Sequence, residues 1–213
     1  MAEKTVVHLL RHGEVRNPRR VLYGRLPGYG LSELGEQMAA RVADYFATRE
    51  VVLVTSSPLD RARQTATPVA EALGLPVGVD ERLTEAENVF QGMSARVVDG
   101  VLRSPSLWRY LVNPFRPSWG EPYAGIAERM HAAVEAAREA VRGREAVLVS
   151  HQLPIWVARL SAEQRHLWHD PRRRQCALAS VTSFLYHDDR LVSIGYTEPA
   201  ADLLADANPV PGA

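Results

Sequence analysis

Short apolar runs rich in β-branched residues alternate along the chain with longer stretches in which apolar positions recur every three or four residues. The short runs are typical of buried strands and the longer stretches of amphipathic helices. Predicted strands cover residues 5–10, 51–55, 146–150, 180–186 and 191–194, and predicted helices cover 32–48, 58–73 and 122–142. Strands and helices alternate over the first three strands. We therefore predict an α/β fold: a three-layer α/β/α sandwich with a mostly parallel central sheet and helices on both faces.

Residues at the helix boundaries agree with these ranges. Ser32 is placed to cap the first helix and Ser57 the second, while Pro58 suits a first helical position. Gly74 and Gly143 follow the second and third helices, where glycine commonly ends a helix. The boundaries are thus encoded locally as well as by periodicity.

Two segments break this rhythm. The stretch 88–120 is rich in proline and aromatic residues and is predicted to form a lid or a packed insertion. The tail, 198–213, is rich in alanine, aspartate and proline and is predicted to be loose. Residues 180–196 are predicted to form a closing hairpin that turns at 187–189. We expect one domain over 1–213, with a core of about residues 5–197.

Composition narrows the class of protein. The 213 residues are 46% hydrophobic and 23% charged, as in a globular protein, and the formal net charge is zero. No bulk field therefore favours nucleic acid or an anionic membrane as a partner. Cys176 is the single cysteine, which excludes an intrachain disulfide, and no Cys/His cluster has zinc-ligand spacing. We see no secretory signal and no membrane-spanning run, so a cytoplasmic location is expected. Monomer and homodimer both stay open.

The first chemistry-bearing motif, Arg11-His12-Gly13-Glu14, directly follows the first predicted strand. Open α/β sheets hold their ligands where strands end and loops begin. Arg11 supplies a fixed cation and His12 a nucleophilic imidazole, while Gly13 allows backbone to approach a ligand closely. The pattern indicates a site that binds an anion and attacks it with histidine.

Two further predicted strands are also followed by an arginine or a histidine. Arg61 lies in the first turn of the helix after strand 51–55, and His151 directly follows strand 146–150. Taken alone, Arg61 and Arg63 are better explained as a solvated helix face, and a lone histidine at a strand end as a structural residue. In a parallel sheet, however, these strand ends meet at one edge. The topology therefore gathers two histidines and two arginines that are distant in sequence.

The site residues named so far do not include an acid that could give a proton to a leaving group. Expelling an alkoxide from a phosphate ester requires an acid. Glu85 in the segment Leu83-Thr84-Glu85 is the candidate, with Glu87 in reserve. An exposed acidic turn would be the ordinary explanation, but the other motifs leave the acid role unfilled.

Several motifs now occur in order along nearly the whole chain, from about residue 5 to 197. They are Arg11-His12-Gly13-Glu14 with Asn17, Leu31-Ser32-x-x-Gly35-x-x-x-Ala39, Ser57-Pro58-Leu59-x-Arg61-x-x-Gln64-Thr65-Ala66, Leu83-x-Glu85 and Ser150-His151. In this combination the chain resembles the histidine phosphatase superfamily, also called phosphoglycerate-mutase-like.

The resemblance implies roles. His12 would be the nucleophile that becomes phosphohistidine, and Glu85 the acid that protonates the leaving group and then activates water. The phosphate pocket would be lined by Arg11, Arg61 and His151, with a hydrogen bond from Asn17. The resemblance implies no metal and no cofactor, because arginines take the electrostatic role of a metal ion.

The sequence also departs from the family pattern. Gln152 stands where many relatives have glycine after the second histidine, and it is a candidate for substrate contact. Proline follows Gly120-Glu121, in place of the common serine. Among the arginines near the first motif, Arg25 is the candidate to reach substrate. The run Arg172-Arg173-Arg174 could bind an anionic substrate tail, although a solvated loop is the favoured interpretation.

The predicted function is that of a phosphomonoesterase, which releases phosphate from a small organic phosphate through a phosphohistidine. Two alternatives stay open. One is a cofactor-dependent phosphoglycerate-type mutase, mildly disfavoured because 88–120 offers no clear basic cluster beyond Arg96, Arg103, Arg109 and Arg116. The other is a non-catalytic phospho-ligand-binding protein, disfavoured because both His12 and Glu85 are present.

Overall fold

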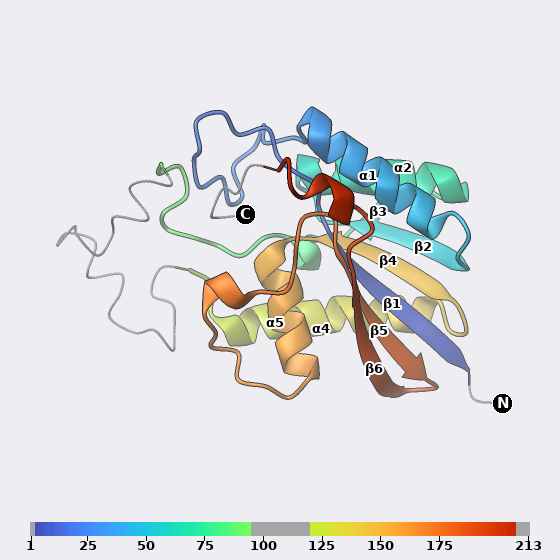
Figure 1. Ribbon diagram of the computed structural model, residues 1–213. Coiled ribbons are helices and arrows are strands. Elements are labelled where there is room, and N and C mark those ends of the chain that lie inside the picture. The colour runs from blue at the N-terminus through green and yellow to red at the C-terminus, as the bar shows by residue number, and fades with distance from the viewer. Residues whose placement is uncertain (1–2, 95–119, 208–213) are drawn as a thin grey trace.

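The computed structural model describes residues 3–94 and 120–207. Six strands form one sheet in the order β3-β2-β4-β1-β5-β6 (Figure 1). The strands are β1 (Lys4–Arg11), β2 (Val51–Ser56), β3 (Val77–Val79), β4 (Glu145–Ser150), β5 (Val181–His187) and β6 (Arg190–Thr197). Strands β1 to β4 pair in parallel, while β5 and β6 pair antiparallel and close one side of the sheet. The prediction of a mostly parallel sheet with a terminal hairpin is confirmed.

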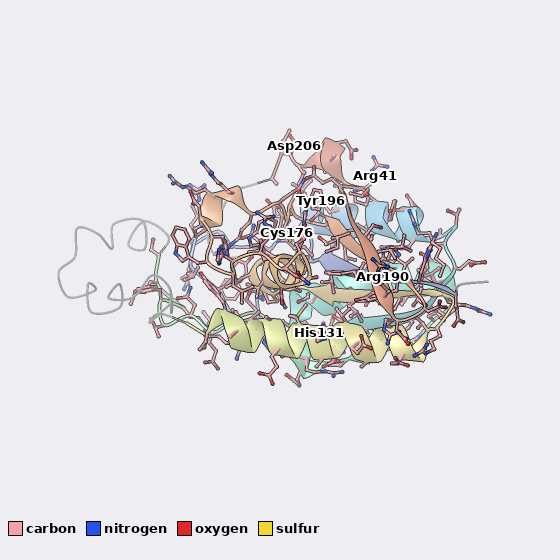
Figure 2. The ribbon with its side chains drawn as sticks, turned by 90° about the horizontal axis from the view of Figure 1, so that it is seen from below. Arg41, His131, Cys176, Arg190, Tyr196 and Asp206 are labelled. Carbon is pink, nitrogen blue, oxygen red and sulfur yellow. The ribbon has the colours of Figure 1, made fainter. Side chains whose placement is uncertain are left out.

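Helices cover both faces of this sheet, as predicted (Figure 1). One layer contains α1 (Glu33–Phe46) and α2 (Asp60–Leu73), and the other contains α4 (Tyr123–Ala140) and α5 (Gln152–Ala162). His131, labelled in Figure 2, lies on the exposed side of α4. Short 3₁₀ turns occur at Glu81–Leu83, Pro171–Arg173 and Ala201–Leu203.

The core is divided by the sheet, and strand periodicity explains how. Successive side chains of a strand point to opposite faces. On β1, Leu9 packs with the α4 and α5 layer, whereas Leu10 packs with α1 and α2. On β4, Leu148 and Val149 divide in the same way. Both faces of the central strands are therefore buried, and for this reason the strands are almost continuously apolar in sequence.

The register brings the predicted site positions to one sheet edge. Arg11, the last residue of β1, pairs with Ser150, the last residue of β4. Ser56, which ends β2, pairs with Val149 of β4. His12, Ser57 and His151 consequently follow three adjacent parallel strands at the same edge.

Several boundaries differ from the sequence prediction. Strand β3 and helix α5 were not predicted, because β3 has only three residues and α5 carries Pro154 in its first turn. Ser32 caps α1 as expected, since its side chain accepts a hydrogen bond from the Gly35 amide. Helix α2 begins at Asp60 rather than at Pro58, and its cap residue, Leu59, makes no side-chain capping bond.

The tail was predicted to be loose, and over 198–207 this is wrong. Ala200 is buried, and Leu203 and Leu204 pack against the core cluster beneath α1 and α2. An ion pair between Arg41 and Asp202, with nitrogen and oxygen 3.1 Å apart, also joins the tail to α1. With Ala207, four residues of this alanine- and aspartate-rich segment therefore belong to or pack against the core cluster. Residues 208–213 lie outside the described part.

The predicted insertion 88–120 leaves and returns at one place, because Asn88 and Gly120 form an antiparallel bridge. Most of it, residues 95–119, lies outside the described residues. The four arginines considered above for a second anion site belong to that part.

Close backbone packing, rather than ligand approach, explains Gly13. A Cβ on Gly13 would lie 2.6 Å from the carbonyl oxygen of Gly35 in α1. A Cβ on Gly35 would lie only 2.0 Å from the carbonyl oxygen of Glu14. The loop that carries His12 is therefore seated directly on the first turn of α1.

We expect Gly35→Ala to destabilise the fold by about 2–4 kcal/mol, because the added methyl overlaps backbone that cannot move aside. Chemical denaturation monitored by circular dichroism measures the change. Gly125→Ala is the matched control: Gly125 lies in the first turn of α4, and, among the described residues, no atom outside its own helical turn lies within 4 Å of its added Cβ. That variant should be as stable as the wild type or up to about 1 kcal/mol more stable. Equal stability of both variants would contradict the close packing.

Candidate active site

His12 is fully buried, and its ring orientation is fixed by hydrogen bonds on both nitrogens. Nδ1 lies 2.8 Å from the carbonyl oxygen of Gly13, which can only accept, so Nδ1 carries the proton. Nε2 lies 3.3 Å from Nε of Arg61, which can only donate. The lone pair of the neutral imidazole is therefore at Nε2 and faces the Arg61 guanidinium.

Arg61 is held rigidly although it is a long, charged side chain. It is 1% exposed, its Nη2 donates to the carbonyl of Gly24 at 2.7 Å, and its guanidinium lies 4.8 Å from the ring centre of Tyr23. Thr65, one turn later, accepts from the Gly13 amide at 3.1 Å. The first turn of α2 is thus fastened to the loop after β1, which places Arg61 against His12.

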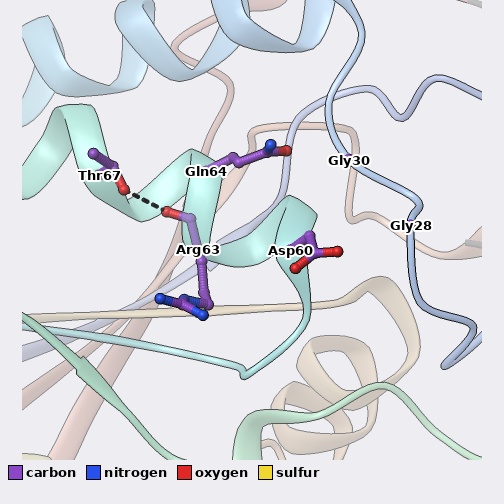
Figure 3. A pocket seen from close by; sticks show the side chains of 6 residues that line it. All are labelled: Gly28, Gly30, Asp60, Arg63, Gln64 and Thr67. Carbon is purple, nitrogen blue, oxygen red and sulfur yellow. Dashed lines mark hydrogen bonds between the residues drawn. The ribbon is translucent and has the colours of Figure 1, made fainter.

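Arg63, two residues later on α2, points elsewhere. It helps to line a surface hollow of about 450 Å³ (Figure 3). The lining residues are Gly28, Gly30, Asp60, Arg63, Gln64 and Thr67, none of them a predicted site residue. Residues two apart on a helix lie on nearly opposite sides. The solvated-face interpretation therefore holds for Arg63 and is wrong for Arg61.

The second histidine lies beside the first. The ring centres of His12 and His151 are 5.1 Å apart, and Nε2 of His151 lies 2.8 Å from Oγ of Ser57. Ser57, predicted as a helix cap, instead orients His151. Arg11 approaches from β1, where its Nη1 donates to the carbonyl of Cys176 at 2.7 Å. Cys176 itself is buried.

The surroundings keep both histidines neutral. Burial lowers the pKa of His12 well below 6.5, and the charges of Arg61 and Arg11 lower it further. Burial also lowers the pKa of His151 well below 6.5, followed by the charge of Arg61 and by His12. A charged imidazole is disfavoured where two guanidiniums already lie close and water is excluded. Nε2 of His12 is consequently unprotonated at neutral pH.

The two candidate acids differ in burial. Glu85 is 6% exposed, whereas the side chain of Glu87 is 70% exposed and pairs with Arg25. Burial raises the pKa of Glu85 above 4.5, against the lowering effects of the Ala86 amide and of the charges of Arg61 and Arg11. Glu85 therefore holds a proton more readily than an ordinary carboxyl does.

Arginines also hold the segment that carries Glu85. Arg25 Nε donates to the carbonyl of Glu85 at 2.6 Å, and Arg129 Nη1 donates to the carbonyl of Thr84 at 2.7 Å. Both guanidiniums pair with Glu121. Arg25, predicted to reach substrate, is thus engaged in positioning Glu85, and direct substrate contact stays a prediction for it.

The remaining predicted contacts are also engaged within the protein. The side-chain amide of Asn17 donates to the carbonyl of Val21 and accepts from its amide, closing the loop after the first motif. Gln152 donates to the carbonyl of Cys176 at 3.3 Å and accepts from Arg174 at 3.4 Å. A substrate role for either residue stays a prediction.

Buried polar atoms mark where ligand oxygens would be received. Among the described residues, Nδ1 of His151 and Oε2 of Glu85 are buried without a hydrogen-bond partner. Buried polar groups are ordinarily satisfied, so such atoms in one cluster are typical of a binding site. Ser150 Oγ donates to the carbonyl of Leu83 at 2.7 Å and so ties the end of β4 to the Glu85 segment. The His12 ring contacts Arg61 and lies beside His151, Arg11 precedes it in the chain, and the charges of Arg61 and Arg11 act on Glu85.

A family model described as histidine phosphatase superfamily, branch 1, matches residues 7–198. The chain belongs to the histidine phosphatase superfamily. The match covers the sheet except for the first three residues of β1, all four described helices and every candidate residue of the cluster.

Three relatives illustrate the similarity. The chain is 54% identical over 201 residues to the Mycobacterium tuberculosis "Uncharacterized protein Rv0525", covering 94% of this chain and all of that one. It is 29% identical over 205 residues to the "Probable phosphoglycerate mutase GpmB" of Escherichia fergusonii, covering 92% and 93%. The solved mycobacterial glucosyl-3-phosphoglycerate phosphatase Rv2419c superposes with a TM-score of 0.72 at 26% identity, covering 93% of this chain and 98% of that one.

Some parts of the cluster were missed from the sequence. Ser57 and Arg129 were not predicted to support the site, and Arg174 was assigned to a solvated loop. No local pattern distinguishes them, because their partners lie 94, 45 and 22 residues away. Within 3–94 and 120–207, no cluster of histidine, cysteine and carboxylate side chains is arranged to hold a metal ion. Over the same ranges no helix has the length and apolarity needed to cross a bilayer.

Proposed function

We propose that this protein is a phosphomonoesterase that hydrolyses a small organic phosphate, without a metal, through a phosphohistidine at His12. The observation that carries the proposal is the fixed tautomer of His12, with Nε2 directed at the Arg61 guanidinium. A nucleophilic lone pair beside a buried cation is suited to attack a phosphoryl group that the cation holds.

In the first half-reaction, His12 Nε2 attacks phosphorus and the bond to the ester oxygen breaks. Glu85 donates its proton to that oxygen, which leaves as an alcohol. Arg11, Arg61 and His151 stabilise the charge on the three equatorial oxygens. In the second half-reaction, water attacks phosphorus and gives its proton to the Glu85 carboxylate. The P–N bond breaks, phosphate is released and neutral His12 is restored.

We expect Glu85→Gln to slow hydrolysis of an alkyl phosphate by about 10²–10⁴-fold, the usual range for a general acid. Phosphorylation of the enzyme by an aryl phosphate should slow far less, because a nitrophenolate leaves without a proton. Rapid-quench measurement of the released alcohol or phenol separates the two substrates. Asp80→Asn, which removes an ionised carboxylate that pairs with Arg82, is the control. Equal losses on both substrates would assign proton donation to another group.

The pKa of Glu85 sets the expected pH dependence. Because burial raises this pKa, the first half-reaction should weaken as pH rises through the raised value and Glu85 loses its proton. Stability follows the same sign: the protonated carboxyl is favoured in the fold below its unfolded pKa, and this contribution is lost as pH rises through the folded pKa. Glu85→Gln should therefore be more stable than the wild type at neutral pH, and the difference should shrink in acid.

A screen of phosphorylated metabolites by phosphate release tests the proposal, with the His12→Ala protein as the blank. Turnover of at least one small monoester, and of a generic aryl phosphate, is expected. The glucosyl-3-phosphoglycerate phosphatase named above supports a small phosphate ester as substrate. A wild-type protein that binds phosphate esters but releases no phosphate would favour the non-catalytic alternative.

A mutase is the second candidate, favoured by the E. fergusonii relative that carries that name. A mutase must return the phosphoryl group to the substrate instead of passing it to water. Phosphoglycerate isomerisation that depends on a bisphosphoglycerate primer, without aryl phosphate turnover, would place the mutase first.

A further inference from the structure

Arg174 is the one member of the Arg172-Arg173-Arg174 run that turns into the protein. Its Nε donates to Nε2 of His169 at 2.9 Å, and its Nη1 lies 3.4 Å from Oε1 of Gln152. The neighbouring Arg172 pairs with Asp170 at the surface, and Arg173 is exposed. One arginine of the run is therefore set apart by its contacts.

The partners of Arg174 hold the guanidinium without neutralising it. Nδ1 of His169 lies 2.7 Å from the carbonyl of Leu167, so Nε2 of this ring is an uncharged acceptor. Tyr123 and Trp156 pack around the same ring, with ring centres 5.4 Å and 6.1 Å from that of His169. Imidazole, amide and phenol surround the cation, and burial lowers the pKa of Arg174.

Several other partly buried arginines of the described chain are paired with carboxylates. Each of four pairs with a carboxylate at 3.2 Å or less: Arg25, Arg129, Arg138 and Arg159. Arg61 and Arg174 form no ion pair with any described carboxylate. For Arg61, the proposed function supplies the counter-ion as the transferred phosphoryl group. Arg174 calls for a second anion, because a desolvated cation is costly when left without one.

The position of Arg174 indicates which part of the substrate would bring that anion. Its charge acts on Glu85 and is in turn influenced by Tyr123, at the start of α4. Gln152 contacts Arg174 and also the Cys176 carbonyl to which Arg11 donates. Arg174 therefore lies near both Arg11 and Glu85, the group proposed to protonate the leaving group.

We propose that Arg174, held by His169 and Gln152, forms a subsite for an anionic oxygen group carried by the leaving group of the substrate. The natural ligand class is a phosphomonoester whose alcohol bears a carboxylate or a second phosphate. The planar guanidinium fork suits either group. The inference rests on the proposed function for the placement of the transferred phosphoryl group, and it makes Arg174 a specificity-determining residue.

Binding to the His12→Ala protein tests the subsite without turnover. Calorimetry with two matched pairs of ligands isolates the second anion: 3-phosphoglycerate against glycerol 3-phosphate, and fructose 1,6-bisphosphate against fructose 6-phosphate. The doubly anionic member of at least one pair should bind about 10- to 100-fold more tightly, as expected for charge-assisted hydrogen bonds. The first pair reports on a carboxylate and the second on a phosphate.

Adding Arg174→Gln to the His12→Ala protein should reduce the ratio of the two affinities in that pair to near one. Arg173→Gln makes the same change of net charge on an exposed neighbour and should leave this ratio unchanged. Arg174→Lys, which keeps the charge and loses the fork, should give an intermediate ratio and serves if the glutamine variant does not fold. Equal affinity for both members of each pair in the His12→Ala protein, with Arg174 unchanged, would overturn the proposed subsite. So would an equal weakening of both members of a pair by Arg174→Gln, which would assign Arg174 to the transferred phosphoryl group.

Failure of the proposed hydrolysis would give a different result from failure of the subsite. A wild-type protein without phosphate release, but with a ratio that depends on Arg174, would leave the subsite in place and remove the hydrolysis.

Discussion

Replacing His12 with alanine is expected to reduce phosphate release by at least about 10⁴-fold, to the level of the blank. The imidazole is the only group of the cluster that combines a neutral lone pair with direct contact to the Arg61 guanidinium among the described residues. Its loss removes the covalent route, and alanine offers nothing in its place. Steady-state phosphate release from an aryl phosphate, followed over several hours, measures the residual rate.

The fold should survive this change, because the buried His12 ring contacts the polar groups Arg61 and His151 and makes no backbone pairing of the sheet with its side chain. Thermal unfolding separates a chemical loss from a structural one. His131→Ala, on the exposed side of α4, is the matched control and should keep the wild-type rate. A folded His12→Ala protein with wild-type turnover would remove the covalent mechanism.

The second large effect is expected at Arg61. Arg61→Lys should lower kcat/KM by about 10²–10³-fold even though the charge is kept. Lysine has no equivalent of the Nε that faces His12, and it cannot also donate to the carbonyl of Gly24. The buried guanidinium thus supplies directed hydrogen bonds as well as charge.

Arg63→Lys is the control for this substitution, because Arg63 lies two positions along the same helix and faces the hollow in Figure 3. It should leave kcat/KM within about twofold of the wild type, as surface substitutions usually have small effects. A mild effect of Arg61→Lys, comparable to that of Arg63→Lys, would show that only the net charge at residue 61 matters.

The sequence predicts that the site residues lie together at one sheet edge, because this follows from the topology of the sheet alone. Arg11, Ser56 and Ser150 end three parallel strands, and the polar residues after them must therefore meet at one edge. The apolar runs that define those strands are strong signals, since both faces of each strand are buried. The sequence therefore predicts that His12, Arg61 and His151 lie together.

The orientation of individual side chains could not be obtained in this way. Ser57 has the composition of a helix cap, yet its hydroxyl contacts His151, a residue 94 positions away. Arg174 looks like its two neighbours in sequence, and only the fold separates it from them. Arg25 is predicted to reach substrate, and its contact with the carbonyl of Glu85 carries no sequence signal. Such contacts depend on long-range packing, which residue spacing does not encode.

In the proposed mechanism His12 carries the phosphoryl group during turnover. Rapid quenching of the Glu85→Gln protein with an aryl phosphate, followed by mass spectrometry of peptides kept at alkaline pH, tests it most directly. Without the Glu85 carboxylate to activate water, the phosphoenzyme should accumulate, and the phosphate should be found on His12 and be lost in acid. Phosphate on any other side chain, or release of the phenol with no phosphorylated protein at any time, would contradict this account.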